Sequence, residues 1–416
     1  MSRVYIYQSE QRYFAQIAAG LEELGREELT ALGADEVRDG YRGFHFHADI
    51  ATLYRINYGA RLLARVLAPL VSFRCHHEDY LYRKAREIDW SGFLRPDQTF
   101  AVFANVSDSK VTHSRYAALR IKDAIVDHMR DRHGERPSVD TRSPHLWVHL
   151  HLARNQAILS VDTSGGALHR RGYRRETVEA PMLETLAAAI IDFSGWDGGR
   201  PLYDPMCGSG TLLAEAWIKA LQIPPGRLRS RFGFESLPEF DPRQWATIQR
   251  EADRAIKTEL AGPETSDLGA SAGRASGLRA SGRQVSSHKP AGRRAPLVSG
   301  SDLDGRALHA ARTNLDRLPH GSRIPLEQRD FRAIESLQGR TIVCNPPYGI
   351  RLRKGEDLSG FYMELGDFLK QRCQGSEAYI YFGEREMIKR IGLRPSWKKP
   401  LRNGGLDGRL AKYELF

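Results

Sequence analysis

The sequence predicts an α/β protein in which a doubly wound domain with a mostly parallel sheet follows an α+β region. From about residue 184, apolar segments of strand length alternate with helical segments, as in sheets covered by helices on both faces. The first 165 residues instead mix hairpin signals, short strands and amphipathic helices. The length of 416 residues, of which 41% are hydrophobic, is sufficient for two or three domains.

The chain is basic, with 62 Lys and Arg against 51 Asp and Glu and a formal charge of +11. Such a charge suits a phosphate-rich partner, although an ordinary solvated surface can carry it too. No apolar run approaches the roughly 18 residues of a membrane helix, and the first residues lack an apolar signal region. We therefore expect a cytoplasmic protein without a membrane span. The four cysteines are far apart, so we also expect no disulfide framework and no metal site.

The N-terminal half begins with a helical pattern over residues 17–32. Phe44 and Phe46 alternate with histidines, which predicts a hairpin strand, and Asp49 can cap the helix that follows. Further along this half, we expect helices over 79–88 and 112–132, and strands over 65–73, 99–106, 146–152 and 156–162.

The C-terminal half contains the expected parallel sheet. The segment 261–299 interrupts it; this segment is rich in Gly, Ala and Ser and has no aromatic residue, so we predict a disordered insertion there. Ligands of such sheets bind outside the carboxyl ends of the strands. The expected helices span 186–193, 211–223, 305–318 and 358–371, and the expected strands span 201–204, 297–299, 324–328, 341–344 and 378–382, with two more after residue 398.

The first candidate motif follows the strand at 201–204. Gly208 and Gly210 allow the backbone to turn sharply and to approach a ligand closely. The acid that ends the strand suits a cationic ligand, such as the sulfonium and amino groups of S-adenosylmethionine. A glycine pair alone is equally compatible with a simple tight turn. The motif reads Asp204-Pro205-Met206-Cys207-Gly208-Ser209-Gly210-Thr211.

Two further acids follow strands of the same sheet. Asp302 lies where a dinucleotide-binding fold places a carboxylate on the ribose hydroxyls, while Asp304 is better placed to cap the next helix. Asp330 can accept the exocyclic amine of adenine, and we expect the ring of Phe331 beside it to cover the base.

The most informative motif is Asn345-Pro346-Pro347-Tyr348-Gly349, directly after the strand at 341–344. The prolines hold the chain extended and leave carbonyl groups without ladder partners. These carbonyls and the Asn345 amide oxygen can accept both protons of a planar amine, while Tyr348 stacks on the base that carries it. Because asparagine is a poor base, its role would be orientation and charge stabilisation. A nucleophilic Cys344 is the alternative, but no nearby base is evident to activate it, and we interpret Cys344 as a packing residue.

In combination, these motifs resemble the THUMP-domain RNA guanine-N2 methyltransferases, especially the bacterial 23S rRNA enzymes. The resemblance rests on Asp204–Thr211, Asn345–Gly349, Glu184–Ala189 and Arg171–Arg174, and on Arg115–Ile125, which is similar to the long THUMP helix. It implies a Rossmann-like class I methyltransferase domain over 184–416. It also implies a ferredoxin-like segment over 1–55, a THUMP RNA-binding domain over 56–165 and a basic linker over 166–183.

The resemblance also implies the roles of individual residues. The Asp204–Thr211 loop would hold the methionine part of the cofactor S-adenosylmethionine, Asp302 its ribose and Asp330 its adenine. Asn345 would lie beside the cofactor and, with Pro346, Pro347 and Tyr348, would hold the guanine amine. RNA contacts are expected from Arg115, Arg120, Lys122, Arg171 and Arg174.

We expect 23S rRNA as the substrate, with tRNA as the alternative. Methylation of DNA or protein amines, or a non-catalytic role in ribosome assembly, would be different functions for the same motifs. Some relatives carry a second, fused methyltransferase domain. This chain has one, so we expect a single modification.

Overall fold

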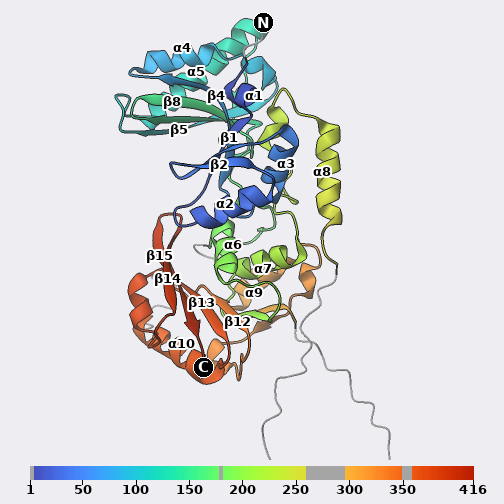
Figure 1. Ribbon diagram of the computed structural model, residues 1–416, viewed down its shortest axis with the longest axis vertical. Helices are drawn as coiled ribbons and strands as arrows, with labels where there is room; N and C mark the ends of the chain where they lie inside the picture. Colours follow the sequence, from blue (N-terminus) through green and yellow to red (C-terminus); the bar gives the residue numbers. More distant parts are fainter. Residues whose placement is uncertain (1–3, 178–180, 259–295, 349–357) are drawn as a thin grey trace, which may run out of the picture.

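The computed structural model describes residues 4–177, 181–258, 296–348 and 358–416. In these ranges the strands form two sheets, one in each half of an elongated molecule (Figure 1). The insertion expected over 261–299 and Gly349 of the proline motif lie outside the described residues, apart from 296–299 at the end of the insertion. No described helix is long and apolar enough to cross a bilayer.

The N-terminal half is a single sheet in the order β2-β3-β1-β4-β8-β7-β5-β6. Strand β4 pairs with both β1 and β8. The predicted ferredoxin-like segment and the predicted THUMP domain therefore share one sheet. The boundary expected after residue 55 falls inside helix α3. The elements are α1 (Ile6–Glu10), β1 (Arg12–Gln16), α2 (Glu22–Ala31), β2 (Asp35–Gly40), β3 (Gly43–His47), α3 (Ile50–Gly59), β4 (Arg65–Arg74), α4 (Glu78–Arg86), β5 (Thr99–Ser107), α5 (Ser114–His133), β6 (Ser138–Val139), β7 (Leu146–Ala153) and β8 (Gln156–Asp162).

Two local predictions in this half have different outcomes. Asp49 caps α3 as expected, since its carboxylate accepts a hydrogen bond from the Thr52 amide at 2.7 Å. The helix expected over 17–32 begins only at Glu22. Ile17 and Leu21 precede it and are buried as loop residues, which explains why they mimic a helical apolar face.

The C-terminal half is a doubly wound sheet in the order β11-β10-β9-β12-β13-β15-β14, as predicted. The first five strands are parallel, so their carboxyl ends share one edge, while β14 and β15 are antiparallel additions. The elements are α6 (Glu184–Phe193), β9 (Leu202–Asp204), α7 (Thr211–Leu221), α8 (Pro242–Arg254), β10 (Val298–Asp302), α9 (Gly305–Leu315), β11 (Leu326–Gln328), β12 (Thr341–Cys344), α10 (Leu358–Arg372), β13 (Glu377–Phe382), β14 (Trp397–Asn403) and β15 (Leu406–Glu414). Short 3-10 helices span Trp90–Gly92, Gly233–Ser236, Gly321–Arg323, Phe331–Ala333 and Arg385–Lys389.

The segment after α7 returns to the N-terminal half, where α8 lies beside α3 (Figure 1). Aromatic rings fill this contact: Tyr54 packs on Phe234 with ring centroids 4.5 Å apart, and Tyr58 meets Trp245 edge-on at 5.2 Å. The burial of these rings holds the two halves together. The sequence analysis did not identify α8.

A buried ion pair also joins the halves. The Arg171 guanidinium donates to Glu215 Oε1 of α7 at 2.8 Å, and the two side chains are 1% and 0% exposed. Arg171 donates further to the carbonyl oxygens of Ala60 and Arg61, while the Tyr173 hydroxyl donates to the same Glu215 oxygen. Burial raises the pKa of Glu215, and the charge of Arg171 opposes that shift. The prediction that Arg171 contacts RNA is therefore wrong, because its side chain is enclosed and paired.

Arg171→Ala is expected to lower the free energy of unfolding by about 3–5 kcal/mol, because it leaves the Glu215 carboxylate buried without its partner. Arg171→Met combined with Glu215→Leu removes both charges and is expected to restore part of the lost stability, because the Tyr173 hydroxyl and the Ala60 and Arg61 carbonyls still lose their partners. Urea denaturation of the two variants measures both effects. An Arg171→Ala variant within about 0.5 kcal/mol of the parent protein would contradict the role given to this pair.

Candidate active site

The turn after β9 is fixed to the end of β10 through backbone-to-carboxylate hydrogen bonds. Asp204 is 1% exposed, and its Oδ1 accepts from the Met206 amide at 3.1 Å. The Gly208 amide donates to Asp302 Oδ2 at 2.8 Å. Burial is the main cause that raises the pKa of both Asp204 and Asp302, and the neighbouring acid Asp302 adds to the shift at Asp204. A positive ligand placed between these carboxylates would offset the cost of burying them.

The glycines of this turn are required by its geometry. Gly208 and Gly210 have φ angles of 54° and 79°, which other residues rarely adopt. At Gly210 a Cβ atom would lie 3.2 Å from the Cβ of Ala311 in α9. Gly300 in β10 is a third constrained position, because its Cβ would lie 2.9 Å from the Asp204 carbonyl oxygen. The sequence analysis had no signal for Gly300.

Arg174 holds the same turn from the protein interior. Its guanidinium donates to Glu184 Oε1 at 2.8 Å, to Thr211 Oγ1 at 3.0 Å and to Ser209 Oγ at 3.2 Å. The side chain is 12% exposed. A fourth hydrogen bond goes to the Met182 carbonyl oxygen. The structure therefore places Arg174 beneath the glycine turn and not on an exposed surface that contacts RNA.

Asn314 of α9 is a second support that the sequence analysis missed. It is 1% exposed, and its Nδ2 donates to the carbonyl oxygens of Ser209 at 3.1 Å and Glu176 at 2.9 Å. Its Oδ1 accepts from the Arg175 amide at 2.7 Å. A polar residue on the buried face of an amphipathic helix was the available signal.

The acids after β10 and β11 differ in their surroundings. Asp302 Oδ1 accepts from the Asp304 amide at 2.9 Å, and Asp304 caps α9 as predicted by accepting from the Arg306 amide. Leu303 between them is 50% exposed and offers an apolar surface beside the Asp302 carboxylate.

Asp330 lies after β11 and forms an ion pair with Arg332 at 3.1 Å. The prediction that the Phe331 ring covers an adenine is wrong. That ring is 3% exposed and meets Phe361 and Phe368 edge-on, at centroid distances of 5.5 and 5.6 Å. The Arg332 guanidinium lies 4.8 Å from the centre of the ring, so the ring is covered by neighbouring side chains. The Asp330 carboxylate accepts from the Arg332 amide and remains 26% exposed.

Asn345 follows the last residue of β12, and its Oδ1 is buried without a hydrogen-bond partner among the described residues. An unpaired buried acceptor costs about 1–3 kcal/mol, so the position favours a ligand that donates protons to it. The preceding Cys344 is buried and its pKa is raised well above the usual value, chiefly by burial. A neutral thiol agrees with its interpretation as a packing residue.

Tyr348 lies against the backbone at the end of β13. A Cβ atom built on Gly383 would lie 2.5 Å from Cγ and Cδ1 of the Tyr348 ring. Only glycine leaves room for the ring in this position. The carbonyl oxygen of Pro347 accepts from the buried Tyr362 hydroxyl at 3.4 Å, which also holds the motif.

Together these groups fit S-adenosylmethionine. Strand β9 lies between β10 and β12, and all three are parallel. Asp204 and Asp302 end their strands and Asn345 follows the third, so the three residues meet at one edge. Two buried carboxylates suit its cationic and hydroxyl groups. The described residues contain no group of His, Cys, Asp and Glu that could hold a metal ion.

Comparison with known families decides the assignment. Residues 171–412 match the family described as an RMKL-like methyltransferase domain. The chain belongs to this family. Residues 75–162 match the THUMP domain, and residues 12–67 match the RlmL ferredoxin-like domain. The predicted family resemblance and the predicted fold class are therefore confirmed.

Two relatives match along almost the whole chain. A candidate RNA methyltransferase of Synechocystis sp., slr0064, is 38% identical over 406 residues, which are 97% of each chain. The ribosomal RNA large subunit methyltransferase K/L of Syntrophotalea carbinolica is 37% identical over 97% of this chain and 53% of its own length. The present chain thus spans about half the length of its K/L relatives.

Two solved structures superpose on almost the whole chain. SMU.472, described as a candidate methyltransferase in complex with SAH, superposes with a TM-score of 0.77 at 25% identity and covers 97% of this chain and 98% of its own. A possible methylase from Clostridium difficile 630 gives a TM-score of 0.75 at 25% identity, covering 98% of both chains. The cofactor of the family is S-adenosylmethionine, as the glycine turn and its carboxylates predict.

The predicted RNA-contacting residues of α5 differ in exposure, since Arg115 is exposed while Arg120 and Lys122 are partly buried. Arg115 is exposed, Arg120 forms an ion pair with Asp79 at 2.7 Å, and Lys122 forms one with Asp123 at 2.6 Å. Their contact with RNA stays a prediction.

Gly383→Ala is expected to lower the methyl-transfer rate about tenfold or more, because the added methyl group displaces the Tyr348 ring, which the sequence motif predicts to stack on the acceptor base. Binding of S-adenosylmethionine, measured by calorimetry, should change little. Gly405→Ala is the matched control, because its Cβ would meet no atom within 4 Å. Equal transfer rates in the two variants would contradict the positioning role of Gly383.

Proposed function

We propose that this protein transfers a methyl group from S-adenosylmethionine to the exocyclic N2 amine of a guanine in RNA, with 23S rRNA as the substrate. The observation that carries the proposal is the Asn345 Oδ1 atom at the sheet edge, which is buried without a hydrogen-bond partner among the described residues and lies beside two buried carboxylates. An acceptor in that place matches an amine that donates protons.

In this proposal, the residues of the first turn bind the cofactor. Asp204 and the loop Pro205–Thr211 hold its methionine part, Asp302 its ribose and Asp330 its adenine. S-adenosylmethionine supplies the electrophilic methyl group when bound. The thiol of Cys207 stays neutral, since burial raises its pKa well above the usual value.

The Asn345-Pro346-Pro347-Tyr348 motif binds the acceptor. The amide oxygen of Asn345 and backbone carbonyls of the motif accept the two amine protons, and the nitrogen lone pair then points away from them. Tyr348 stacks on the purine ring. Because no strong base is required, a proton leaves the amine after the methyl group has been transferred, and the polar groups stabilise the charge in between.

RNA as the substrate is supported by the THUMP match over residues 75–162 and by the names of the relatives, which include several ribosomal RNA large subunit methyltransferases. The net charge of +11 favours binding to phosphates. The target guanine must be unpaired or flipped from its helix to reach the sheet edge.

The test is transfer of labelled methyl groups into purified 23S rRNA, 16S rRNA and tRNA from a strain that lacks this protein, followed by nucleoside analysis. The expected product is N2-methylguanosine in 23S rRNA. Asn345→Ala is expected to lower the rate about 10²- to 10³-fold, as for loss of one stabilising polar group, while cofactor binding persists.

Three results would change the proposal. Label confined to tRNA would change the proposed substrate from 23S rRNA to tRNA and leave the proposed chemistry unchanged. A methylated base other than guanine would refute the acceptor assignment. An unchanged rate in Asn345→Ala would refute the role of its amide oxygen.

A further inference from the structure

A strip of six cations lies in the C-terminal part of the chain, where the sequence contains no acid between Met387 and Asn403. Among the described residues, none of these six side chains forms an ion pair, whereas the nearby Arg409 does so with Asp407. Five of the six are exposed. We call this set the basic strip; it comprises Lys389, Arg390, Arg394, Lys398, Lys399 and Arg402.

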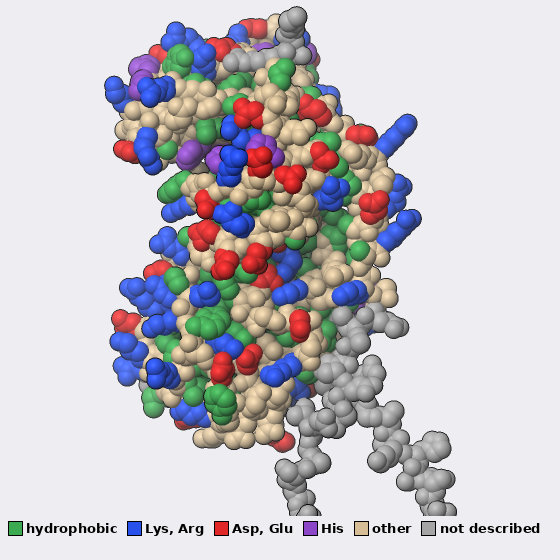
Figure 2. Space-filling model, viewed as in Figure 1, with side chains coloured by type: hydrophobic (Ala, Val, Ile, Leu, Met, Phe, Trp, Pro, Cys, Tyr) green, Lys and Arg blue, Asp and Glu red, His purple; other side chains and the backbone are tan. Residues whose placement is uncertain are grey.

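The cations of the N-terminal helices are different. Arg86 pairs with Asp131, Arg130 with Asp127, and Lys84 with Glu87, all at distances of 2.7–2.8 Å. These pairs neutralise much of the positive charge on α4 and α5 at short range. Among the described residues, α4 and α5 thus hold fewer cations without an ion pair than the basic strip does. Figure 2 shows Lys and Arg side chains gathered over the side of the lower domain that holds β14 and β15.

Strand register relates the basic strip to the active site. Cys344 pairs with Ile380, which is opposite Ala411, and Ala411 is opposite Lys398. Lys398 is thus level with the residue before Asn345, and Arg402 lies further toward the edge of the sheet where Asn345 is found. Three strand spacings separate β12 from β14, a span of about 14 Å.

Protection of an edge strand is a simpler explanation for part of this charge. Strand β14 is the outermost strand, and lysine and proline on such strands prevent pairing with other chains. That explanation covers Lys398 and Pro400. It does not account for Lys389, Arg390 and Arg394, which precede the strand.

We propose that the basic strip binds the phosphate backbone of the RNA strand that carries the target base. Five of its cations are exposed, and strand register places Lys398 and Arg402 beside the edge where Asn345 is found, so the strip suits a linear polyanion whose base reaches Asn345 a few nucleotides away. Lys399 is half-buried, and its ammonium lies 4.9 Å from the centre of the Phe193 ring. This inference rests on the proposed function, because it assumes an RNA substrate.

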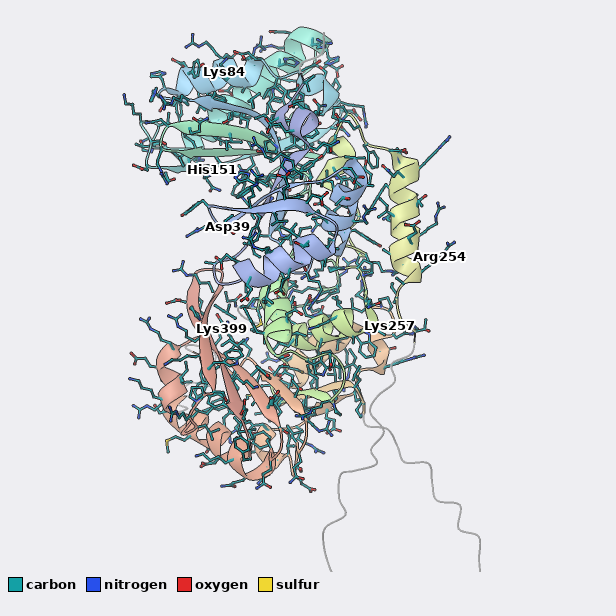
Figure 3. The ribbon with its side chains drawn as sticks, viewed as in Figure 1. Asp39, Lys84, His151, Arg254, Lys257 and Lys399 are labelled. Carbon is teal, nitrogen blue, oxygen red and sulfur yellow. The ribbon has the colours of Figure 1, made fainter. Side chains whose placement is uncertain are left out.

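The test compares two triple variants with the same loss of charge. Arg394→Gln/Lys398→Gln/Arg402→Gln neutralises the strip. Arg250→Gln/Arg254→Gln/Lys257→Gln neutralises three exposed cations without a described ion pair, in and just after α8. Figure 3 shows Arg254 and Lys257 on the opposite side of the molecule from Lys399.

Methyl transfer into purified 23S rRNA is measured for each variant between 50 and 200 mM salt, with cofactor binding as the folding control. The strip variant is expected to raise the KM for RNA about tenfold or more, with little change in kcat. The slope of the logarithm of RNA affinity against the logarithm of salt concentration should become shallower by about 2. Each phosphate contact on a single strand contributes about 0.7 to that slope, and three cations are removed. The α8 variant should stay within about twofold of the parent protein.

Equal KM values and equal salt slopes in the two triple variants would refute RNA binding by the basic strip. The proposed function would survive that result, because the parent protein would still methylate RNA. If the parent protein methylates no RNA, the proposed function is refuted, and so is the proposal that the basic strip binds the substrate.

Discussion

The buried contact between Arg171 and Glu215 is the constraint on which the rest of the arrangement depends. It fixes the chain between the two halves to helix α7, while the same guanidinium holds carbonyl groups of the N-terminal half. Three residues further on, Arg174 supports the glycine turn from the inside. One short segment therefore couples the orientation of the N-terminal half to the shape of the cofactor site. A buried guanidinium is suited to this role because its donors are held in a fixed plane.

The chemistry at the sheet edge follows from burial. Asp204 and Asp302 are carboxylates whose raised pKa values reflect their removal from water, so a cationic ligand would be favoured between them. The thiols of Cys207 and Cys344 are also buried, but burial keeps them protonated and unreactive. What remains is the amide acceptor of Asn345 and the ring of Tyr348, which in the proposed function orient an amine without removing its proton. This set agrees with transfer to an exocyclic amine rather than to a ring carbon.

The sequence predicted those parts of the fold in which local pattern and tertiary structure agree. The strand Thr341–Cys344 has the expected bounds, and Asp49 and Asp304 cap helices as expected. Arg171 and Arg174 were misassigned because basic residues are usually exposed, and because Arg171 pairs with Glu215 while Arg174 donates to Ser209 and Thr211, all of which are distant in sequence. The Tyr348 contact of Gly383 was unpredictable for the same reason, since it arises only when β12 and β13 pair.

The central claim is that Asn345 presents the 2-amino group of a guanine for methylation. The most direct measurement replaces the mapped target guanosine by inosine, which lacks only that amino group, in an otherwise identical RNA. The account predicts methyl transfer at the normal rate into the guanosine RNA and into a 7-deazaguanosine RNA, and none at the inosine. Methylation of the inosine would contradict the account, because the accepting atom would then lie elsewhere on the base.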